Sequence, residues 1–218
     1  MEEYIILNLH SSVWNNIKPC MGSHKLIKGD ELMLDILKAT LEDSPVVKKG
    51  DYNYFVHPIT DGVPEISPDL LHEVVGEIRN QLVKDYDKVV AIEAMGLPIG
   101  AVLAVEVNKP LVIVRKKSYG LGNEVSVQQI TGYSKSQLFI NGLEAHDKVV
   151  IVDDVLSTGG TLKAVITALI NMGVHIVDVI VAIEKGDNRE RIELETGVEI
   201  KALVKVDVVD NKVIVTEI

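Results

Sequence analysis

Hydrophobic and polar positions alternate in blocks along the second half of the chain. Short apolar runs rich in Val and Ile stand at residues 88–94, 110–116 and 148–154, and runs of this length predict buried strands. Residues 97–107 form an apolar segment long enough for a helix. After the third run, hydrophobic residues recur at helical spacing until Gly173, which stands where a helix C-cap is expected. These helical positions are Leu162, Val165, Ile166, Leu169 and Ile170.

Two more apolar runs, at residues 176–186 and 198–209, predict further strands. Strands that are apolar throughout and are separated by helices are typical of a parallel sheet covered on both faces. The pattern therefore predicts an α/β fold with a mostly parallel twisted sheet flanked by helices.

The chain before residue 85 has a different character. Residues 52–68, "YNYFVHPITDGVPEISP", have the Pro and Gly content of a loop or small hairpin, and residues 69–83 have the pattern of an amphipathic helix. We expect a small N-terminal cap, or hood, at about residues 45–85, and the core of the domain at about residues 86–218.

Composition limits the kinds of partner. The 218 residues are 47% hydrophobic, which is enough for one main domain with a full core. The 22 basic and 32 acidic residues give a formal charge of -10, so nucleic acid is not an expected partner. Cys20 is the only cysteine, and neither a signal peptide nor an apolar stretch of about 18 residues is visible. We expect a cytoplasmic protein with no membrane partner.

The stretch "VVIVDDVLSTGGT", residues 149–161, contains the residues best suited to bind a ligand. Asp153 and Asp154 end a predicted strand, and residues 157–161 lead into the next helix, where ligands of parallel sheets bind. A helix N-terminus offers unpaired N–H groups and a partial positive charge, and glycines allow close approach to the backbone. The segment therefore suits a phosphate group.

The two carboxylates narrow the choice of ligand. Beside a phosphate they would repel it unless they accept hydrogen bonds from hydroxyls or face a cation, so a sugar phosphate with Mg²⁺ fits. Two other interpretations remain for this stretch: Asp153 is a helix cap beside a tight glycine turn, or the strand binds Mg²⁺ in a nucleoside triphosphatase. The second interpretation lacks support because the chain contains no G-x-x-x-x-G-K-[ST] motif.

The same stretch resembles the phosphoribosyl pyrophosphate signature of the type I phosphoribosyltransferases. The likeness extends to four more segments, and the whole is most similar to archaeal hypoxanthine phosphoribosyltransferases, whose architecture is like that of adenine phosphoribosyltransferase. It covers about residues 33–218 and implies the type I fold with a hood and a mobile lid at about 116–138. Residues 1–32 form an N-terminal extension of unknown role. The four segments are "IEAMGLP" at 92–98, "VIVRKKSYGLGNEV" at 112–125, "TGYSKSQLFINGL" at 131–143 and "HPITDGVPEISP" at 57–68.

This resemblance implies transfer of ribose 5-phosphate from phosphoribosyl pyrophosphate to a purine base, with Mg²⁺ carried by the pyrophosphate rather than by direct protein ligands. It also implies a homodimer, because cationic residues of the family can reach a neighbouring subunit's site. The implied ribose ligands are Asp153 and Asp154. The implied 5′-phosphate ligands are Ser157, Thr158, Gly159, Gly160 and Thr161, and the pyrophosphate turn is Glu93, Ala94, Met95 and Gly96. The implied cations are Arg115, Lys116 and Lys117, of which Arg115 joins the two aspartates as a catalytic candidate.

Two departures from the family pattern leave the general acid unassigned. Gly132 precedes Tyr133 where adenine-specific relatives have a lid Glu, and Ser157 stands where the mammalian type of hypoxanthine-guanine enzyme has an Asp. Tyr133 and Lys135 are then expected to position the lid.

The identity of the base is predicted from the hood segment at Val63 and Pro64. An alignment on "ISP" at residues 66–68 implies that this segment lies against the base, and proline has no N–H to donate to adenine N1. Hypoxanthine and guanine are therefore the expected bases, and adenine or xanthine are the alternatives. The structural explanation of Pro64 is that it only makes the turn after Gly62 rigid.

Two noncatalytic functions are alternatives to the enzyme. A phosphoribosyl-pyrophosphate-sensing transcriptional regulator would need a recognition helix and a basic face near the N-terminus, which residues 1–45 do not display. A sugar-phosphate binder without catalysis would need a degraded lid or pyrophosphate turn, and both look intact in the sequence.

Overall fold

A six-stranded sheet organises the part of the chain that the computed structural model describes, which is residues 34–50, 52–83, 85–130 and 135–216. The strand order is β10-β9-β8-β7-β3-β4, and every neighbouring pair is parallel except β9 with β10. This confirms the predicted mostly parallel sheet. The strands are β3 (Lys88–Ile92), β4 (Leu111–Val114), β7 (Lys148–Leu156), β8 (His175–Lys185), β9 (Lys201–Val209) and β10 (Lys212–Thr216).

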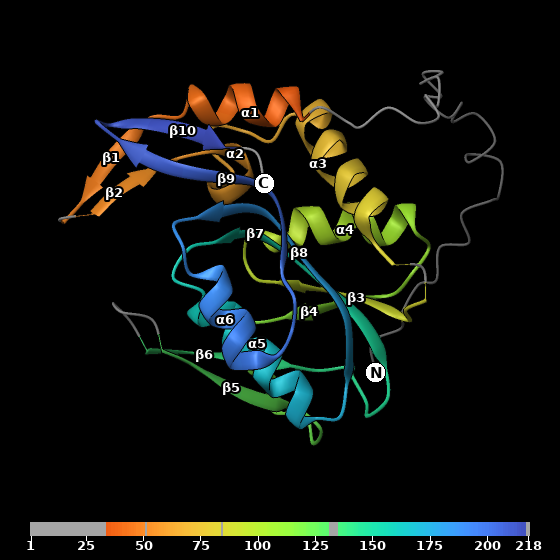
Figure 1. Cartoon of the computed structure of the whole chain (residues 1–218). Coiled ribbons are helices and arrows are strands. Elements are labelled where there is room, and N and C mark those ends of the chain that lie inside the picture. Colours follow the sequence, from red (N-terminus) through yellow and green to blue (C-terminus); the bar gives the residue numbers. More distant parts are fainter. Residues whose placement is uncertain (1–33, 51, 84, 131–134, 217–218) are drawn as a thin grey trace, which may run out of the picture. The chain divides into compact units, whose positions relative to one another are not determined.

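Helices cover both faces of the sheet, as Figure 1 shows. Helices α3 (Pro68–Gln81) and α4 (Gly96–Glu106) lie on one face, and α5 (Gly160–Asn171) and α6 (Arg189–Thr196) lie on the other. Successive side chains of a strand point to opposite faces. Accordingly, Val89 packs with the first pair of helices and Val90 with the second. The central strands β3 and β7 are therefore largely apolar, because both of their faces are buried.

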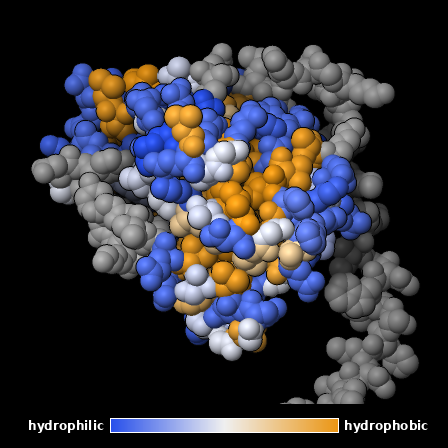
Figure 2. Space-filling view, turned by 60° about the horizontal axis from the view of Figure 1, so that its bottom comes forward, coloured by the Kyte–Doolittle hydropathy of each residue, from blue (hydrophilic) through white to orange (hydrophobic). Residues whose placement is uncertain are grey.

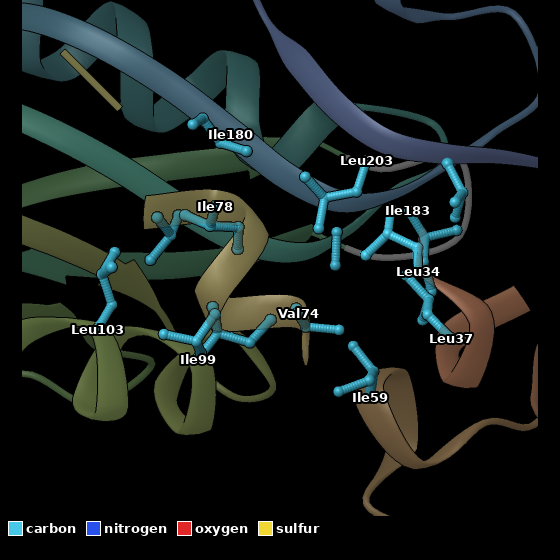
Figure 3. Packing of buried hydrophobic residues seen from close by; sticks show 14 of the residues in the cluster. Leu34, Leu37, Ile59, Val74, Ile78, Ile99, Leu103, Ile180, Ile183 and Leu203 are labelled. Carbon is cyan, nitrogen blue, oxygen red and sulfur yellow. The ribbon is translucent and has the colours of Figure 1, made fainter. Parts of the chain in front are cut away.

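Close packing joins the hood region to the core of the sheet (Figure 3). Leu37 from α1 (Asp35–Glu42) and Ile59 from α2 (Pro58–Asp61) belong to the same buried cluster as Val74 of α3 and Ile99 of α4. Leu37, Val74 and Ile99 are 0% exposed. Burial of such a side chain contributes about 1.5–3 kcal/mol to stability, so this cluster fixes the position of the hood.

The hood contains a small hairpin that begins before the predicted loop or hairpin at residues 52–68 and shares only its second strand with that segment. Strands β1 (Val46–Lys49) and β2 (Tyr52–Phe55) pair in antiparallel fashion, and the Lys185 Nζ atom at the end of β8 donates to the Asn53 carbonyl at 2.9 Å. The His57 Nδ1 atom accepts from the Ile59 N–H at 3.2 Å and so caps α2. His57 is fully buried, and burial lowers its pKa to about 4.

Part of the segment predicted as the lid, residues 116–138, forms regular structure. Strands β5 (Val125–Ile130) and β6 (Lys135–Ile140) form an antiparallel pair. Val127 and Leu138 are directly opposite each other in this pair, and both are buried in the cluster that contains α5. In β5, Val125 and Val127 alternate with Ser126 and Gln128, which is a strand pattern, but the glycines around it favoured a loop.

Besides β5 and β6, the pattern did not predict helices α1, α2 and α6 or strand β10, and two predictions concern residues outside the described part of the chain. Helix α6 has a single buried hydrophobic residue, Ile192, so it lacks an apolar stripe, and β10 is a short edge strand. The extension at residues 1–32 lies outside the described residues, as does Tyr133. Among the described helices, none is long and apolar enough to cross a lipid bilayer.

Candidate active site

The candidate site is built from turns and strand ends at the carboxyl edge of β3, β4 and β7, where the ligands of parallel sheets bind. Strand β7 runs to Leu156, two residues beyond its predicted end, so Asp153 and Asp154 are the sixth and seventh of its nine residues. Asp153 pairs in register with Val181 of β8. The pairing holds the backbone of the acidic residues in the sheet.

Both aspartates are nearly inaccessible, with 8% of Asp153 and 9% of Asp154 exposed. Burial raises the pKa of Asp153 well above its ordinary value, and the neighbouring Asp154 charge raises it further, while the Lys116 charge lowers it. Burial also raises the pKa of Asp154, with the Asp61 carboxylate of the hood acting in the same direction. A pair of buried acids in this state gains from any ligand that donates hydrogen bonds or brings positive charge.

The turn between β3 and α4 lies directly against this acidic pair. A Cβ atom at Gly96 would lie 2.7 Å from Asp153 Oδ1 and 3.2 Å from the Val152 carbonyl oxygen, so the position requires glycine. The Glu93–Ala94 peptide is cis. The structure thus places the predicted pyrophosphate turn and the predicted ribose ligands side by side.

Residue Met95 connects this turn to the hood. A Cβ atom at Gly62 would lie 3.5 Å from the Met95 Cε atom, and Gly62 adopts the left-handed conformation with φ of 69°. Val63 and Pro64 follow immediately, are exposed, and are joined by a cis peptide bond. The hood segment therefore borders the same site.

Glu93 orients the cationic end of β4. Its Oε2 atom accepts from Arg115 Nε at 2.9 Å and from the Lys116 N–H at 3.0 Å. The Lys116 N–H is the main cause of the lowered pKa of Glu93, and Arg115 adds to it. The Arg115 guanidinium also lies 5.6 Å from the centre of the Tyr119 ring, and the Lys117 Nζ atom lies 6.0 Å from it. The predicted cations are thus next to the predicted pyrophosphate turn, although Lys116 and Lys117 are exposed.

The phosphate loop, defined as residues 157–161, leads from β7 into α5. Gly159 has a φ of 72° and is the N-cap of α5, which begins at Gly160. A Cβ atom at Gly159 would lie 1.8 Å from the Ile192 Cδ1 atom of α6. Ile192 therefore leaves no room for a side chain at Gly159, and helix α6, which was not predicted, packs directly against the loop.

A cavity of about 700 Å³ borders this loop on a different side from the acidic pair. It is lined by the outer face of α5, including Lys163 and Thr167, and by Ser126 of β5. Asp153 and Asp154 do not line it.

Glu124 is a second feature that the sequence did not reveal. Its carboxylate accepts hydrogen bonds from the Ser118 hydroxyl, from the Tyr119 N–H at 2.9 Å and from the Asn141 side-chain nitrogen at 2.9 Å. These bonds, with that from Asn141 first, lower the pKa of Glu124 to about 2. We call residues 116–124 the lid turn, and Glu124 is the group that holds it. Of the predicted lid-positioning residues, Lys135 begins β6, but its side chain lies outside the described part, as Tyr133 does.

Comparisons with known proteins agree with this geometry. The phosphoribosyl transferase domain model matches residues 68–211. The chain is 52% identical over 181 residues to the hypoxanthine/guanine phosphoribosyltransferase of Methanobacterium lacus, covering 83% of this chain and 95% of that protein. It is 53% identical over 181 residues to the protein of the same name from Methanothrix thermoacetophila, again covering 83% and 95%.

Solved structures show the same fold. Adenine phosphoribosyltransferase from Rhodothermus marinus is similar with a TM-score of 0.64 and 25% identity, covering 79% of this chain and 97% of that one. The enzyme from Saccharomyces cerevisiae, complexed with an imino-altritol bisphosphate and adenine, gives a TM-score of 0.65 at 20% identity over 78% and 97% of the two chains. The chain therefore belongs to the phosphoribosyltransferase family and has its type I fold.

Proposed function

We propose that this chain transfers the ribose 5-phosphate group of phosphoribosyl pyrophosphate to hypoxanthine, and to guanine as well, releasing pyrophosphate and the purine nucleoside monophosphate. The observation that carries the proposal is the identity of about half of all aligned residues to archaeal proteins named hypoxanthine/guanine phosphoribosyltransferase, along nearly their whole length. The arrangement of the site supports it independently.

Each part of the sugar-phosphate donor has a matching surface. Ribose hydroxyls donate hydrogen bonds to Asp153 and Asp154, whose buried carboxylates gain most from such donors. The 5′-phosphate binds the N–H groups of the phosphate loop and the hydroxyls of Ser157, Thr158 and Thr161.

The pyrophosphate is held on the other side of the acidic pair. It meets the backbone of Ala94, Met95 and Gly96, while Arg115, oriented by Glu93, faces its charge together with Lys116 and Lys117. The close approach of Gly96 to Asp153 supports this arrangement, because it brings the pyrophosphate turn next to the ribose ligands. The bond that breaks joins ribose C1 to the pyrophosphate, so both of its sides are then bound at one place.

Mg²⁺ fits the residues present. The described residues include no cluster of three or more side chains that could hold a metal ion alone. A magnesium ion that arrives with the sugar-phosphate donor would need few protein ligands, because Mg²⁺ keeps several waters. Its charge would also stabilise the ionised forms of Asp153 and Asp154, which burial alone disfavours. When bound, the ion neutralises the charge that develops on the departing pyrophosphate.

Water must be excluded while the ribose carries positive charge at C1, and the lid is proposed to do this. The exposed lid turn, residues 116–124, follows Arg115 and borders the site. Its contacts through Glu124 are polar and either exposed or half-buried, which suits a segment that exchanges contacts when the ligand arrives.

The choice of base rests on Pro64. Met95 lies beside Gly62, so the segment that follows Gly62 is well placed to meet a purine bound beside the ribose. Pro64 has no N–H for adenine N1, whereas hypoxanthine and guanine carry a hydrogen on N1 and use O6 as an acceptor. A buried polar mismatch costs about 1–3 kcal/mol, which is roughly tenfold to a hundredfold in discrimination.

We also propose the division of the chain into an N-terminal extension at 1–32, a hood at about 45–85, a core at about 86–218 and a lid at about 116–138. The active form is proposed to be a cytoplasmic homodimer. Hydrophobic side chains gather on the face of the molecule seen in Figure 2, and patches of this kind commonly mark protein interfaces.

The proposed function is tested by supplying hypoxanthine, guanine, xanthine, adenine and uracil separately, each with phosphoribosyl pyrophosphate and Mg²⁺. Pyrophosphate release is expected with hypoxanthine and guanine, and little with the other bases. Reactions without a base give the background hydrolysis. Release with none of the bases, or with uracil above the purines, would refute the proposal.

A further inference from the structure

Helix α6 and its N-cap, Asn188, contact three successive residues of the phosphate loop, although they lie about 30 positions further along the chain. Two of the contacts are hydrogen bonds to backbone carbonyls, and the third is the close approach of a side chain to a glycine. The three contacts join Asn188 to Ser157, Arg191 to Thr158 and Ile192 to Gly159.

The two hydrogen bonds fix the direction of the loop's peptide groups. Asn188 Nδ2 donates to the Ser157 carbonyl at 3.0 Å, and Arg191 Nη2 donates to the Thr158 carbonyl at 3.1 Å. Both peptide groups concerned are trans, since the cis bonds of the described residues lie elsewhere. In a trans peptide the N–H points opposite to the C=O. The N–H groups of Thr158 and Gly159 therefore point away from α6.

Those N–H groups are available to a ligand. Within the described part of the chain, no acceptor is found for the backbone N–H of Thr158 or of Gly159. Backbone donors that remain unpaired at a helix start are the groups that bind phosphate. The carbonyl contacts on one side of the loop thus present its donors on the other side.

We propose that Asn188 and Arg191 are positioning residues for the 5′-phosphate of the sugar-phosphate donor. They act through the loop and do not touch the ligand. The inference rests on the proposed function, and it assigns a role to two residues outside the recognised signature.

The two side chains are themselves held in place. The Asn188 Oδ1 atom accepts from Arg191 Nη2 at 3.2 Å, so Asn188 must direct its Nδ2 donor at Ser157. Arg191 also pairs with Glu195 at 3.3 Å, and Lys163 of α5 pairs with the same Glu195 at 2.7 Å. The network ties α6 both to α5 and to the phosphate loop, which keeps the donors from turning to other acceptors.

Ile192 contributes the steric part of the same arrangement. It is fully buried, and its Cδ1 atom fills the space beside Gly159, where φ is 72°. The loop cannot move towards α6 because Ile192 is there, and it is drawn towards α6 by the two carbonyl bonds. Its conformation is fixed before the ligand binds.

The test uses the full chain with Asn188→Ala, Arg191→Met and both together, measured by calorimetry with ribose 5-phosphate and, separately, with pyrophosphate and Mg²⁺. Each single change is expected to weaken ribose 5-phosphate binding about three- to tenfold, the value of one hydrogen bond, and to raise KM for phosphoribosyl pyrophosphate alike. Pyrophosphate binding and kcat should change less than about twofold, because the β3–α4 turn is untouched.

Two more variants separate positioning from general damage. Arg191→Lys keeps a donor near the Thr158 carbonyl and should recover part of the lost affinity. Arg79→Met removes an exposed arginine that pairs with Glu106 at 2.9 Å in a distant helix, and it should bind ribose 5-phosphate like the unchanged protein. Melting temperatures check that each variant is folded, and Asn188→Asp, which replaces the donor by an acceptor, substitutes for Asn188→Ala if that variant does not fold.

Unchanged ribose 5-phosphate affinity in the folded double variant would overturn the positioning role. So would an equal loss of pyrophosphate binding, because that result indicates a general loss of structure. Failure of the unchanged protein to bind ribose 5-phosphate would instead overturn the proposed function, so the two failures are distinguishable.

Discussion

The phosphate loop and the lid turn both extend from the same edge of the sheet, yet they are held in opposite ways. The phosphate loop is backed by α6, with Gly159 buried against the fully buried Ile192. The lid turn is held through Glu124, and residues 116–123 are all exposed. Exposed polar contacts are worth little and buried packing is worth much. One half of the site is therefore fixed in advance, and the other half has contacts that are easily exchanged.

This difference matches the two tasks of the proposed reaction. The donor's ribose phosphate has to be held in one position throughout, which a preformed loop does with little cost on binding. The cover has to open and close in every turnover, and strong contacts would slow it. Substitutions in the two regions are expected to differ accordingly in size and in kind.

The largest effect is expected at the acidic pair beside the phosphate loop. Asp153→Asn together with Asp154→Asn should lower kcat/KM by about a hundredfold or more, because neutral amides are poorer acceptors for ribose hydroxyls than carboxylates. Steady-state kinetics with varied phosphoribosyl pyrophosphate would measure this loss. Near-normal turnover in the double variant would show that the two aspartates do not bind the ribose.

The same double variant should be more stable than the unchanged protein at pH 7. Burial raises the pKa of both acids above the ordinary value of 3.8, so the unfolded chain releases its protons first as the pH rises. Stability is then lost as the pH rises from 3.8 through the folded pKa, and uncharged Asn avoids this loss. Thermal melting at pH 7 and at pH 4 should show a gain that shrinks at the lower pH. A lower melting temperature at pH 7 would contradict the account.

A smaller but distinct effect is expected at Gly159. Gly159→Ala adds a Cβ atom 1.8 Å from Ile192 Cδ1, at a φ of 72°, so both packing and backbone are strained. We expect a loss of about 1–4 kcal/mol in the free energy of unfolding, with weaker ribose 5-phosphate binding. Gly142→Ala is the matched control, because its φ is 79° and no atom lies within 4 Å of the added Cβ. Equal losses at the two glycines would mean that the contact with α6 is unimportant.

At the lid turn, the effect should be kinetic rather than structural. Glu124→Gln weakens bonds to the Tyr119 N–H and the Ser118 hydroxyl, and we expect kcat to fall by up to about tenfold with less than about 1 kcal/mol lost in stability. Binding of ribose 5-phosphate should not change. A deletion of residues 118–134 is a poorer test, because it also removes β5 and uncovers the core beneath it. A large loss of stability in the Glu124→Gln variant would contradict the conclusion that the lid turn is held by weak, easily exchanged contacts.

The smallest effect at neutral pH concerns His57, a buried polar group of the hood. Its pKa is about 4 in the folded chain against an ordinary value of 6.5, so the unfolded chain binds the proton first as the pH falls. Stability from this group is complete above pH 6.5 and is lost between 6.5 and 4, with a slope of at most about 1.4 kcal/mol per pH unit.

Denaturant unfolding of His57→Gln across this pH range would measure the effect. The variant should lose the slope that the unchanged protein shows between pH 6.5 and 4. His72→Gln is the control, since the His72 side chain is 65% exposed. The assignment would fail if the two variants behaved alike.

Sequence patterns predicted the elements whose burial is regular. Strands β3, β4 and β7 and helices α4 and α5 could be predicted because their apolar residues are either continuous or spaced for a helix. Helix α6 could not, because a single buried residue, Ile192, gives no period. The strands of the lid were missed because they are short and lie in a segment that contains several glycines.

The same distinction explains which candidate residues the sequence revealed. Asp153, Asp154 and the phosphate loop form one contiguous motif, so their order on a strand, loop and helix could be read directly. Glu124 and Arg191 act through contacts with backbone groups, and such contacts leave no spacing pattern. They become visible when the donor and acceptor atoms are placed in space.

The central claim is the transfer of ribose 5-phosphate to a 6-oxopurine, and a competition reaction tests it most directly. Equal concentrations of hypoxanthine and adenine are supplied together with phosphoribosyl pyrophosphate and Mg²⁺, and the two nucleotide products are separated and quantified. Early in the reaction their ratio equals the ratio of the two kcat/KM values, so the amount of active enzyme cancels. The account predicts inosine monophosphate in at least about tenfold excess, since adenine finds no N–H at Pro64. Adenosine monophosphate in equal or greater amount would contradict it.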